Sequence, residues 1–164
     1  MAAAQSKGRL VRVVSPLGPD VFKFRSMNGS EELGRLFQYS LQVLSDKIDI
    51  SFADILGQDM TVRFETPDGA TRFFHGFVAE ICQDGTEGRM ASYQVTLRPW
   101  LWFLTRTADC RMFQNKTVPD IVKQVLQDQG FTDVEESLSR TYPAWEYCVQ
   151  YRETDFKFVS RLME

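Results

Sequence analysis

Apolar and polar residues alternate along much of the first hundred positions, which is the pattern of β-strands with one buried face. The clearest alternation covers residues 37–45, where every second side chain is apolar. Turns that contain proline or glycine interrupt the pattern at residues 15–20 and 67–69. The pattern therefore predicts a closed or nearly closed antiparallel β-domain over residues 9–98. Its expected strands cover residues 9–14, 21–27, 37–45, 60–66, 71–82 and 90–98.

The pattern changes after Arg98 to an apolar run, Trp100–Leu104, and then to a helical period. The run has no polar face, so we expect it to be wedged between other elements. Thr117 is placed to cap a helix that ends at Gly130, and Thr154 is placed to cap a second helix. Apolar residues follow each cap at helical spacing. The second half is therefore predicted to contain helices over residues 114–130 and 153–164 and a strand over residues 147–151.

The composition is that of an ordinary globular protein, with 43% hydrophobic, 25% charged and 13% aromatic residues. The net charge is −3 and the basic residues do not cluster, which argues against nucleic acid as a partner. No stretch approaches the roughly 20 apolar residues of a membrane-spanning helix, and residues 1–8 have no signal-peptide core. We therefore expect synthesis in the cytoplasm and no stable membrane insertion of this segment.

The cysteines and the single histidine give little support for a reactive site. Cys82, Cys110 and Cys148 are odd in number, widely spaced and without a CxxC motif, which predicts three reduced thiols and no zinc site. His75 lies in an expected strand between Phe73 and Phe77 on the same face. We interpret it as a structural residue packed against those rings, because no nucleophile, acid partner or second ligand is evident for it.

Other candidate chemistry is equally weak. The adjacent carboxylates Glu31–Glu32 and Glu135–Glu136 lie in polar segments and are interpreted as solvated charges, not as a glycosidase pair. Trp100 and Trp102 lack the surrounding basic residues of a base-stacking site, so we assign them to core or interface packing. No glycine-rich phosphate loop occurs. The sequence thus indicates no catalytic, cofactor-binding or metal-binding residues, and no cofactor.

Four longer stretches carry a further signal: EELGRLFQYSLQVLS (31–45), FFHGFVAEI (73–81), LRPWLWFLTRTADCRMFQNKTVPDIV (97–122) and YCVQYRETDFKFVSRLME (147–164). Together they span nearly the whole chain. In sequence, order and spacing they resemble the N-terminal hub of the VgrG family, the spike proteins of type VI secretion systems. The third and fourth stretches are long enough to make this resemblance specific.

The resemblance implies a mainly β fold with an α+β appendage. An antiparallel, barrel-like phage-hub domain, residues 9–105, would be followed by the start of a second α+β module, residues 106–164. VgrG proteins are similar to the baseplate hub and spike of contractile phage tails. Three copies form a ring on the end of the Hcp tube, and the spike beyond it is often tipped by a PAAR protein. Some members carry toxic C-terminal domains, and the family supplies no catalytic hub residues.

For this chain the resemblance therefore implies a structural hub component and not an enzyme. The intact protein would be a homotrimer and an adaptor between the Hcp tube and the puncturing spike. Its further partners would be a PAAR tip, baseplate components and effectors. After synthesis in the cytoplasm it would be delivered to a target cell by the secretion machinery.

The chain departs from the family pattern at its end. The last expected helix reaches Glu164 without a glycine, a proline or a terminal cap, so we expect a fragment whose second module is incomplete. The apolar faces of the 117–130 and 154–164 helices should then be partly uncovered. We expect the isolated chain to be monomeric or weakly and non-specifically associated, with exposed apolar patches around Trp100, Trp102, Val159 and Leu162. Specific association would have to exceed a cost of several kcal/mol in lost freedom.

Two alternative functions stay open. A hub protein of a contractile phage tail, or of a related injection particle, would have nearly the same sequence features, and a neighbouring gene for a phage tube or an Hcp tube would distinguish the two. An enzyme such as a muramidase would need a carboxylate cleft that the sequence does not reveal. A turnover assay on cell-wall material would detect it.

Overall fold

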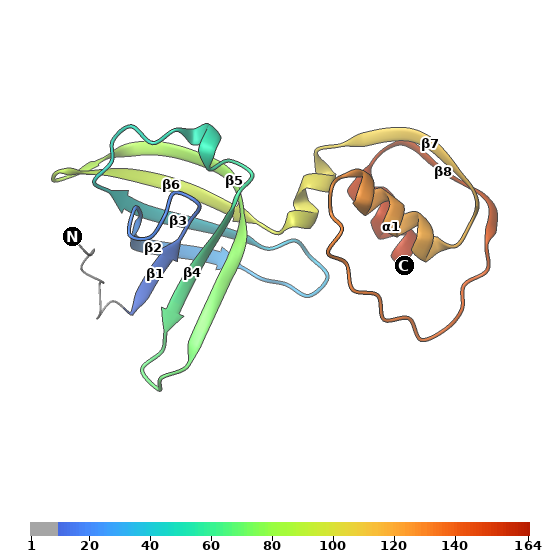
Figure 1. The fold of residues 1–164 in the computed structure, drawn as a ribbon, viewed down its shortest axis with the longest axis horizontal. Helices are drawn as coiled ribbons and strands as arrows, with labels where there is room; N and C mark the ends of the chain where they lie inside the picture. The colour runs from blue at the N-terminus through green and yellow to red at the C-terminus, as the bar shows by residue number, and fades with distance from the viewer. Residues whose placement is uncertain (1–9) are drawn as a thin grey trace. The chain divides into compact units, whose positions relative to one another are not determined.

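The structure is a computed structural model that describes residues 10–164, and it divides into two compact units that meet between Trp100 and Leu101 (Figure 1). The first unit is a single curled antiparallel sheet. The second combines a two-stranded sheet with two helices. No helix among residues 10–164 has the length and apolar character needed to cross a membrane.

The sheet of the first unit has the strand order β1-β4-β5-β6-β3-β2, in which every neighbouring pair is antiparallel. The two edge strands, β1 and β2, lie near each other, so the sheet curls into a half-barrel (Figure 1). A short 3-10 helix, Phe52–Asp54, lies in the connection between β3 and β4. The strands are β1 Val11–Val14, β2 Lys23–Ser30, β3 Gln38–Ser45, β4 Asp59–Glu65, β5 Thr71–Glu87 and β6 Met90–Arg98.

This sheet confirms the predicted mainly β fold, and its largest differences from the predicted strands are at the ends of β2 and β5. β2 continues through Ser30, although residues 28–30 were expected in a loop. β5 continues to Glu87, although a polar connection was expected after Cys82. The pairing of β5 with β6 has an irregularity between Gln83 and Gly85, which accommodates this polar, glycine-containing extension within a paired strand. The first strand was predicted to begin at residue 9, which lies outside the described residues.

The core of the first unit lies on the concave side of the sheet. Its largest fully buried side chain is Tyr93, whose ring makes edge contacts with Phe22 and Phe52 and whose hydroxyl donates a hydrogen bond of 3.0 Å to the carbonyl of Lys47. The alternating residues of β3 and β6 supply most of the remaining core, as their sequence pattern predicted. The core residues are Val13, Phe22, Tyr39, Leu41, Val43, Ile55, Met60, Val62, Val78, Ala91, Tyr93, Val95 and Leu97.

Tyr39 closes one end of this core. Its ring stacks on Phe37, with the centroids 4.6 Å apart, and covers Gly29, the residue directly opposite on β2. A Cβ atom at Gly29 would lie 2.4 Å from the Tyr39 ring, so the close approach requires glycine. The buried Tyr39 hydroxyl donates a hydrogen bond to the Glu31 carboxylate. Burial, and then the bond to Glu31, raise the pKa of Tyr39 from 10.0 to about 12.

We predict that Tyr39 makes the native state sensitive to alkali. Because its pKa is higher in the folded protein than in the unfolded chain, its contribution to stability is complete below pH 10 and is lost as the pH rises through about 12. The two-unit difference corresponds to about 2 to 3 kcal/mol. Urea unfolding of the wild type and of Tyr39→Phe at a series of alkaline pH values measures it. A wild-type loss that persists unchanged in Tyr39→Phe would contradict the prediction.

The second unit packs two helices on one face of a two-stranded antiparallel sheet. A 3-10 segment, η2 Trp100–Thr105, precedes it, and η2 carries the partly buried Trp100 and Trp102. Thr117 and Thr154 cap the two helices as predicted, since their hydroxyls accept hydrogen bonds from the Asp120 and Lys157 amides. The elements are β7 Ala108–Lys116, α1 Val118–Asp128, β8 Trp145–Thr154 and α2 Asp155–Met163.

The expectation that the helix faces would be uncovered is wrong for their central residues. Ile121 and Val125 of α1 and Phe158 and Val159 of α2 are buried between the helices and the sheet. Phe113 of β7 stacks on Phe158 with the ring centroids 5.6 Å apart. The inner face of β7 and β8 thus covers both helices, and the large exposed apolar surface of this unit lies elsewhere.

Candidate functional site

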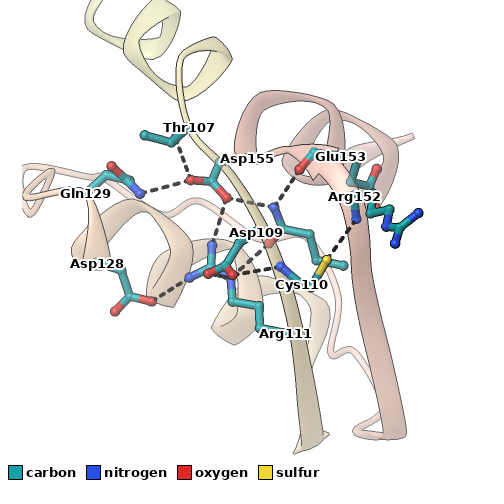
Figure 2. Close-up of polar contacts among 10 residues, drawn as sticks. Thr107, Asp109, Cys110, Arg111, Asp128, Gln129, Arg152, Glu153 and Asp155 are labelled. Atoms are coloured by element: carbon teal, nitrogen blue, oxygen red, sulfur yellow. Dashed lines mark hydrogen bonds and ion pairs between the residues drawn. The ribbon is translucent and has the colours of Figure 1, made fainter.

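The most strongly connected group of polar side chains lies inside the second unit, around Asp155 (Figure 2). Asp155 is 1% exposed, and its carboxylate accepts four hydrogen bonds. Oδ1 accepts from Arg111 at 3.0 Å and Gln150 at 2.7 Å, and Oδ2 accepts from Thr107 at 2.6 Å and Gln129 at 2.9 Å. The backbone amide of Asp155 also donates to the Thr107 carbonyl at 3.0 Å.

Every element of the second unit contributes to this polar cluster. Arg111 comes from β7 and Gln150 from β8, while Gln129 follows α1 and Asp155 begins α2. A carboxylate at the first position of a helix is also favoured by the partial positive charge of the helix N-terminus. The cluster therefore joins elements that are distant in sequence.

Each of the three nitrogens of the Arg111 guanidinium also donates a hydrogen bond. Besides Asp155, it donates to the Gln150 side-chain oxygen at 2.8 Å and to Asp128 at 2.9 Å, and it lies 3.7 Å from Asp109. A carboxylate offers about four lone-pair sites, and Asp155 uses four, so no acceptor position is left for a ligand. The polar cluster is thus built as a structural tie and not as a reactive centre.

His75 does not lie where we expected it. The interpretation that it packs against both Phe73 and Phe77 holds only for Phe77, because His75 and Phe73 are exposed on the outer face of β5. Its Nδ1 lies 2.8 Å from the hydroxyl of Thr61 on β4, and its ring meets the edge of Phe77 at 6.0 Å. Alternation identified the face shared by these residues, but not that this face points outward.

The two carboxylate pairs serve separate contacts. Glu31 accepts the Tyr39 hydrogen bond, and Glu32 forms an ion pair with Arg35 at 3.1 Å. Glu136 forms an ion pair with Lys123 at 2.8 Å. Within the described part of the chain, no three histidine, cysteine or acidic side chains come together as metal ligands would.

The three thiols differ in their surroundings, since Cys148 is buried whereas Cys82 and Cys110 are exposed. Burial raises the pKa of the Cys148 thiol. We predict that alkylation of the native, unreduced protein at mildly alkaline pH modifies Cys82 and Cys110 at least tenfold faster than Cys148, because the thiolate is the reactive form. Peptide mass spectrometry over a time course measures the rates. In guanidinium the three rates should converge, and equal rates in the native protein would contradict the prediction.

An apolar groove of about 360 Å³ lies beside α1. Its apolar lining includes Val118 and Val122 of α1, Val134 and Leu138 of the following irregular segment, and Met163 of α2. The residues that line the groove also include both basic and acidic side chains. The groove holds no convergent polar groups of the kind that orient a small ligand.

The outer face of the β7–β8 sheet is a bare apolar surface. The side chains on this face alternate with the buried ones, because successive residues of a strand point to opposite sides. Helices cover the inner face, and the side chains of the outer face are exposed. Aromatic residues and methionine on an exposed face are characteristic of protein–protein interfaces. The exposed residues are Cys110, Met112, Trp145, Tyr147, Val149 and Tyr151.

Comparisons with known proteins agree with this architecture. The sequence profile of the phage tail baseplate hub (GPD) family matches residues 30–164. The type VI secretion system spike protein VgrG1b of Pseudomonas aeruginosa is 58% identical over 164 residues, which is 100% of this chain and 22% of that protein. VgrG1a of the same organism is 55% identical over 156 residues, 95% of this chain and 24% of that protein. The chain thus spans less than a quarter of the length of these relatives.

A solved structure also has this fold. The E. coli c3393 protein superimposes with a TM-score of 0.75 and 29% identity, over 93% of this chain and 42% of that one. It is described as a component of the type VI secretion system with structural similarity to the T4 bacteriophage tail proteins gp27 and gp5. A tail protein from Neisseria meningitidis MC58, 15% identical, superimposes with a TM-score of 0.62 over 93% of this chain and 45% of that one, a likeness of fold alone.

Proposed function

Because the chain belongs to the phage tail baseplate hub family and to the VgrG spike proteins of type VI secretion systems, we propose that it is a structural hub segment of such a spike. The observation that carries the proposal is the 58% identity to VgrG1b along the whole chain. In the intact protein this segment would act in a homotrimer, as the adaptor between the Hcp tube and the puncturing spike. The protein would be made in the cytoplasm and delivered outward by the machinery.

The internal construction of the second unit supports a role in transmitting force. Force passes through a hub only if its parts do not slide, and the polar cluster ties every element of the second unit to Asp155. The acceptor sites of the Asp155 carboxylate are all used within the protein, which favours a structural function over catalysis. We also propose that residues 9–105 and 106–164 act as separate modules. The division of the chain after Trp100 supports a boundary within or beside η2.

The bare face of β7 and β8 supports further assembly. An aromatic surface of this kind would be covered in the complete particle, by other parts of the spike or by baseplate components. A PAAR tip and effectors would reach this segment only through the rest of the protein. A phage tail hub is the second candidate function, and the match of the phage hub profile to residues 30–164 favours it. The identity to VgrG1b favours the secretion system over the phage.

The proposal is tested by a chimera in which this chain replaces its matching segment in Pseudomonas aeruginosa VgrG1b. We expect the chimera to restore release of the spike and of Hcp into the medium by cells that lack VgrG1b-dependent secretion. The control is the same chimera with Asp155→Ala, which should be unstable and inactive. A chimera that accumulates to wild-type level, forms trimers and yet releases no Hcp would contradict the adaptor role.

A further inference from the structure

The two faces of the β7–β8 sheet differ in what covers them. The inner face packs against α1 and α2 and contributes to the polar cluster, and Figure 1 shows α1 on that side of the paired strands. On the outer face, Met112 is 58%, Tyr147 64% and Tyr151 64% exposed. The outer face is a continuous patch of large side chains, because its residues stand side by side in the pairs Cys110–Tyr151, Met112–Val149, Gln114–Tyr147 and Lys116–Trp145.

The middle of the outer face is uncharged. At one end of the sheet, the Lys116 ammonium donates a hydrogen bond to Gln124 of α1, so it is turned towards the helices. At the other end, the Arg152 guanidinium lies against the Tyr151 ring, 5.2 Å from the ring centroid. An anionic lipid surface needs several basic residues, each of which contributes about 1 kcal/mol, so this face does not favour one. The uncharged residues of the face are Cys110, Met112, Gln114, Trp145, Tyr147, Val149 and Tyr151.

An uncharged face is able to pack on a copy of itself. In a two-fold contact the same patch serves on both partners, so a single patch is sufficient. For the same reason a charged patch would meet its own charge, and like charges that meet in an interface cost several kcal/mol. Sheets also pack face to face, about 10 Å apart, with the side chains of the two faces interdigitating. The outer face therefore meets the chemical conditions for contact with a second copy.

The area of the outer face is close to what a specific contact needs. The exposed fractions of Met112, Trp145, Tyr147, Val149 and Tyr151 correspond to roughly 600 Å² per copy, compared with about 800 Å² per partner in a standard interface. Two copies would bury up to roughly 1,200 Å² in total, which is the lower limit for specific and stable interfaces. Since association also costs lost freedom of motion, the dimer should be weak, with a dissociation constant in the micromolar range.

We propose that the outer face of β7 and β8 is a self-association surface, on which a second copy of this chain docks through the same residues in a two-fold dimer. A closed three-fold ring uses two different patches on each protomer, so this dimer is separate from the proposed trimer and forms between unassembled chains. In the complete particle other parts would cover the same face, and dimer and particle would compete for it. The contact itself does not depend on the proposed function; only this competition does.

Sedimentation velocity of the 164-residue chain, with reductant and from micromolar to submillimolar concentration, tests the contact. We expect the average mass to rise towards that of a dimer and no further. The rise should persist at about 1 M salt, where the Debye length is about 3 Å and ion pairs are screened, because the face is uncharged. Tyr147→Glu and Tyr147→Lys should each weaken association about tenfold or more, since each places a like charge on both sides of the contact. Tyr147 is exposed and lies opposite Gln114, so the fold tolerates either charge.

The decisive sample is an equimolar mixture of the Tyr147→Glu and Tyr147→Lys chains. In a two-fold contact the two faces then carry opposite charges, so the mixture should associate about fivefold or more tightly than either variant alone. If the face docked instead on a different surface of the second copy, mixing would give no gain, because that surface is the same in both variants. Leu33→Glu is the matched control, since Leu33 is fully exposed in the turn before β3, and it should leave association unchanged.

Cys110 provides a second measurement on the same face. Its alkylation rate in the wild type should fall several-fold between dilute and concentrated protein, because the dimer covers its thiol. Cys82 of β5 is also exposed and lies outside the face, so its rate should not change with concentration. Tyr147→Glu should remove the concentration dependence at Cys110. Peptide mass spectrometry measures both rates in one sample.

Three outcomes would overturn the inference. The first is a wild-type chain that stays monomeric at every concentration; if that monomer binds phosphatidylcholine vesicles, the face belongs to a lipid surface instead. The second is association that Leu33→Glu weakens equally or that the mixture of charge variants does not recover. The third is a discrete trimer of the wild-type chain. All three leave the chimera test of the hub role intact, because release of Hcp by the chimera does not require the dimer.

Discussion

Asp155→Ala is expected to destabilise the second unit by about 3 to 5 kcal/mol, because removing one partner of a buried ion pair leaves the other charge uncompensated. The Arg111 guanidinium would keep its bond to the exposed Asp128 but lose its buried carboxylate. Thr107, Gln129 and Gln150 would each lose a hydrogen-bond acceptor in a site that is 1% exposed at Asp155. Since these residues join β7, β8, α1 and α2, the whole unit should unfold at lower denaturant.

The matched control is Asp128→Asn, which removes a carboxylate that also bonds Arg111 but lies near the surface. Its cost should be within about 1 kcal/mol, as for other exposed ion pairs. Asp155→Asn should fall between the two, because an amide keeps one acceptor and presents a donor to the surrounding donors. Urea unfolding, monitored by circular dichroism, measures the loss of stability in each of the three variants. If Asp155→Ala and Asp128→Asn cost the same, the polar cluster does not hold the unit together.

Tyr93→Ala should destabilise the first unit by about 3 to 5 kcal/mol, the usual cost of removing a large buried aromatic side chain. Tyr93 is fully buried and touches Phe22 from the segment before β2 and Phe52 from the connection before β4. Removing its side chain would leave a cavity lined by these separate segments of the first unit. They cannot all move inward to fill it.

Tyr93→Phe separates packing from hydrogen bonding. It keeps the ring and removes only the hydroxyl that donates to the Lys47 carbonyl, so about 1 kcal/mol is expected. The denaturant midpoints of the wild type, Tyr93→Ala and Tyr93→Phe, read by a probe in the first unit, measure the contributions of the ring and of the hydrogen bond. A cost for Tyr93→Phe as large as that for Tyr93→Ala would assign the effect to the hydrogen bond instead of the ring.

The first unit could be predicted from the sequence because one physical rule dominates it. β3 and β6 each have one buried face, so Leu41 and Val95 alternate with polar residues and the period is visible. The rule fails where a strand is exposed on both faces. The extension of β5 beyond Cys82 is polar and contains Gly85, which is typical of a loop, and only pairing with β6 makes it a strand.

β7 was not predicted, and the polar cluster explains why. The inward positions of this strand include Arg111, whose charge hides the apolar period that Phe113 would otherwise reveal. The charge is tolerated there because Asp155 meets it from the start of α2. Arg111 and Asp155 are 44 residues apart, so no local motif connects them. Asp155 by itself has the character of an ordinary first-turn residue of a helix.

The alternation along β8 predicts a strand, but it does not predict correctly which face of the strand is buried. Tyr147, Val149 and Tyr151 alternate with Cys148 and Gln150, which correctly indicates a strand. An apolar-in, polar-out rule would bury the tyrosines, but the structure buries Cys148 and Gln150 instead. The direction is set by the polar cluster, because Gln150 must face Asp155.

The strand order of the first unit also sets the order in which the protein is able to fold. β3 pairs with β6, so Tyr39 cannot form its pairing until Leu97 has been synthesised. The strand pairs β2–β3 and β4–β5, in contrast, are each joined through a short connection. The pairing of β3 with β6 joins residues that are far apart in sequence. Such pairings form late and slow the completion of a sheet. During synthesis, β3 presents an unpaired edge until residue 97 has left the ribosome. Chains made on neighbouring ribosomes therefore risk pairing through open β3 edges before each has closed on its own β6.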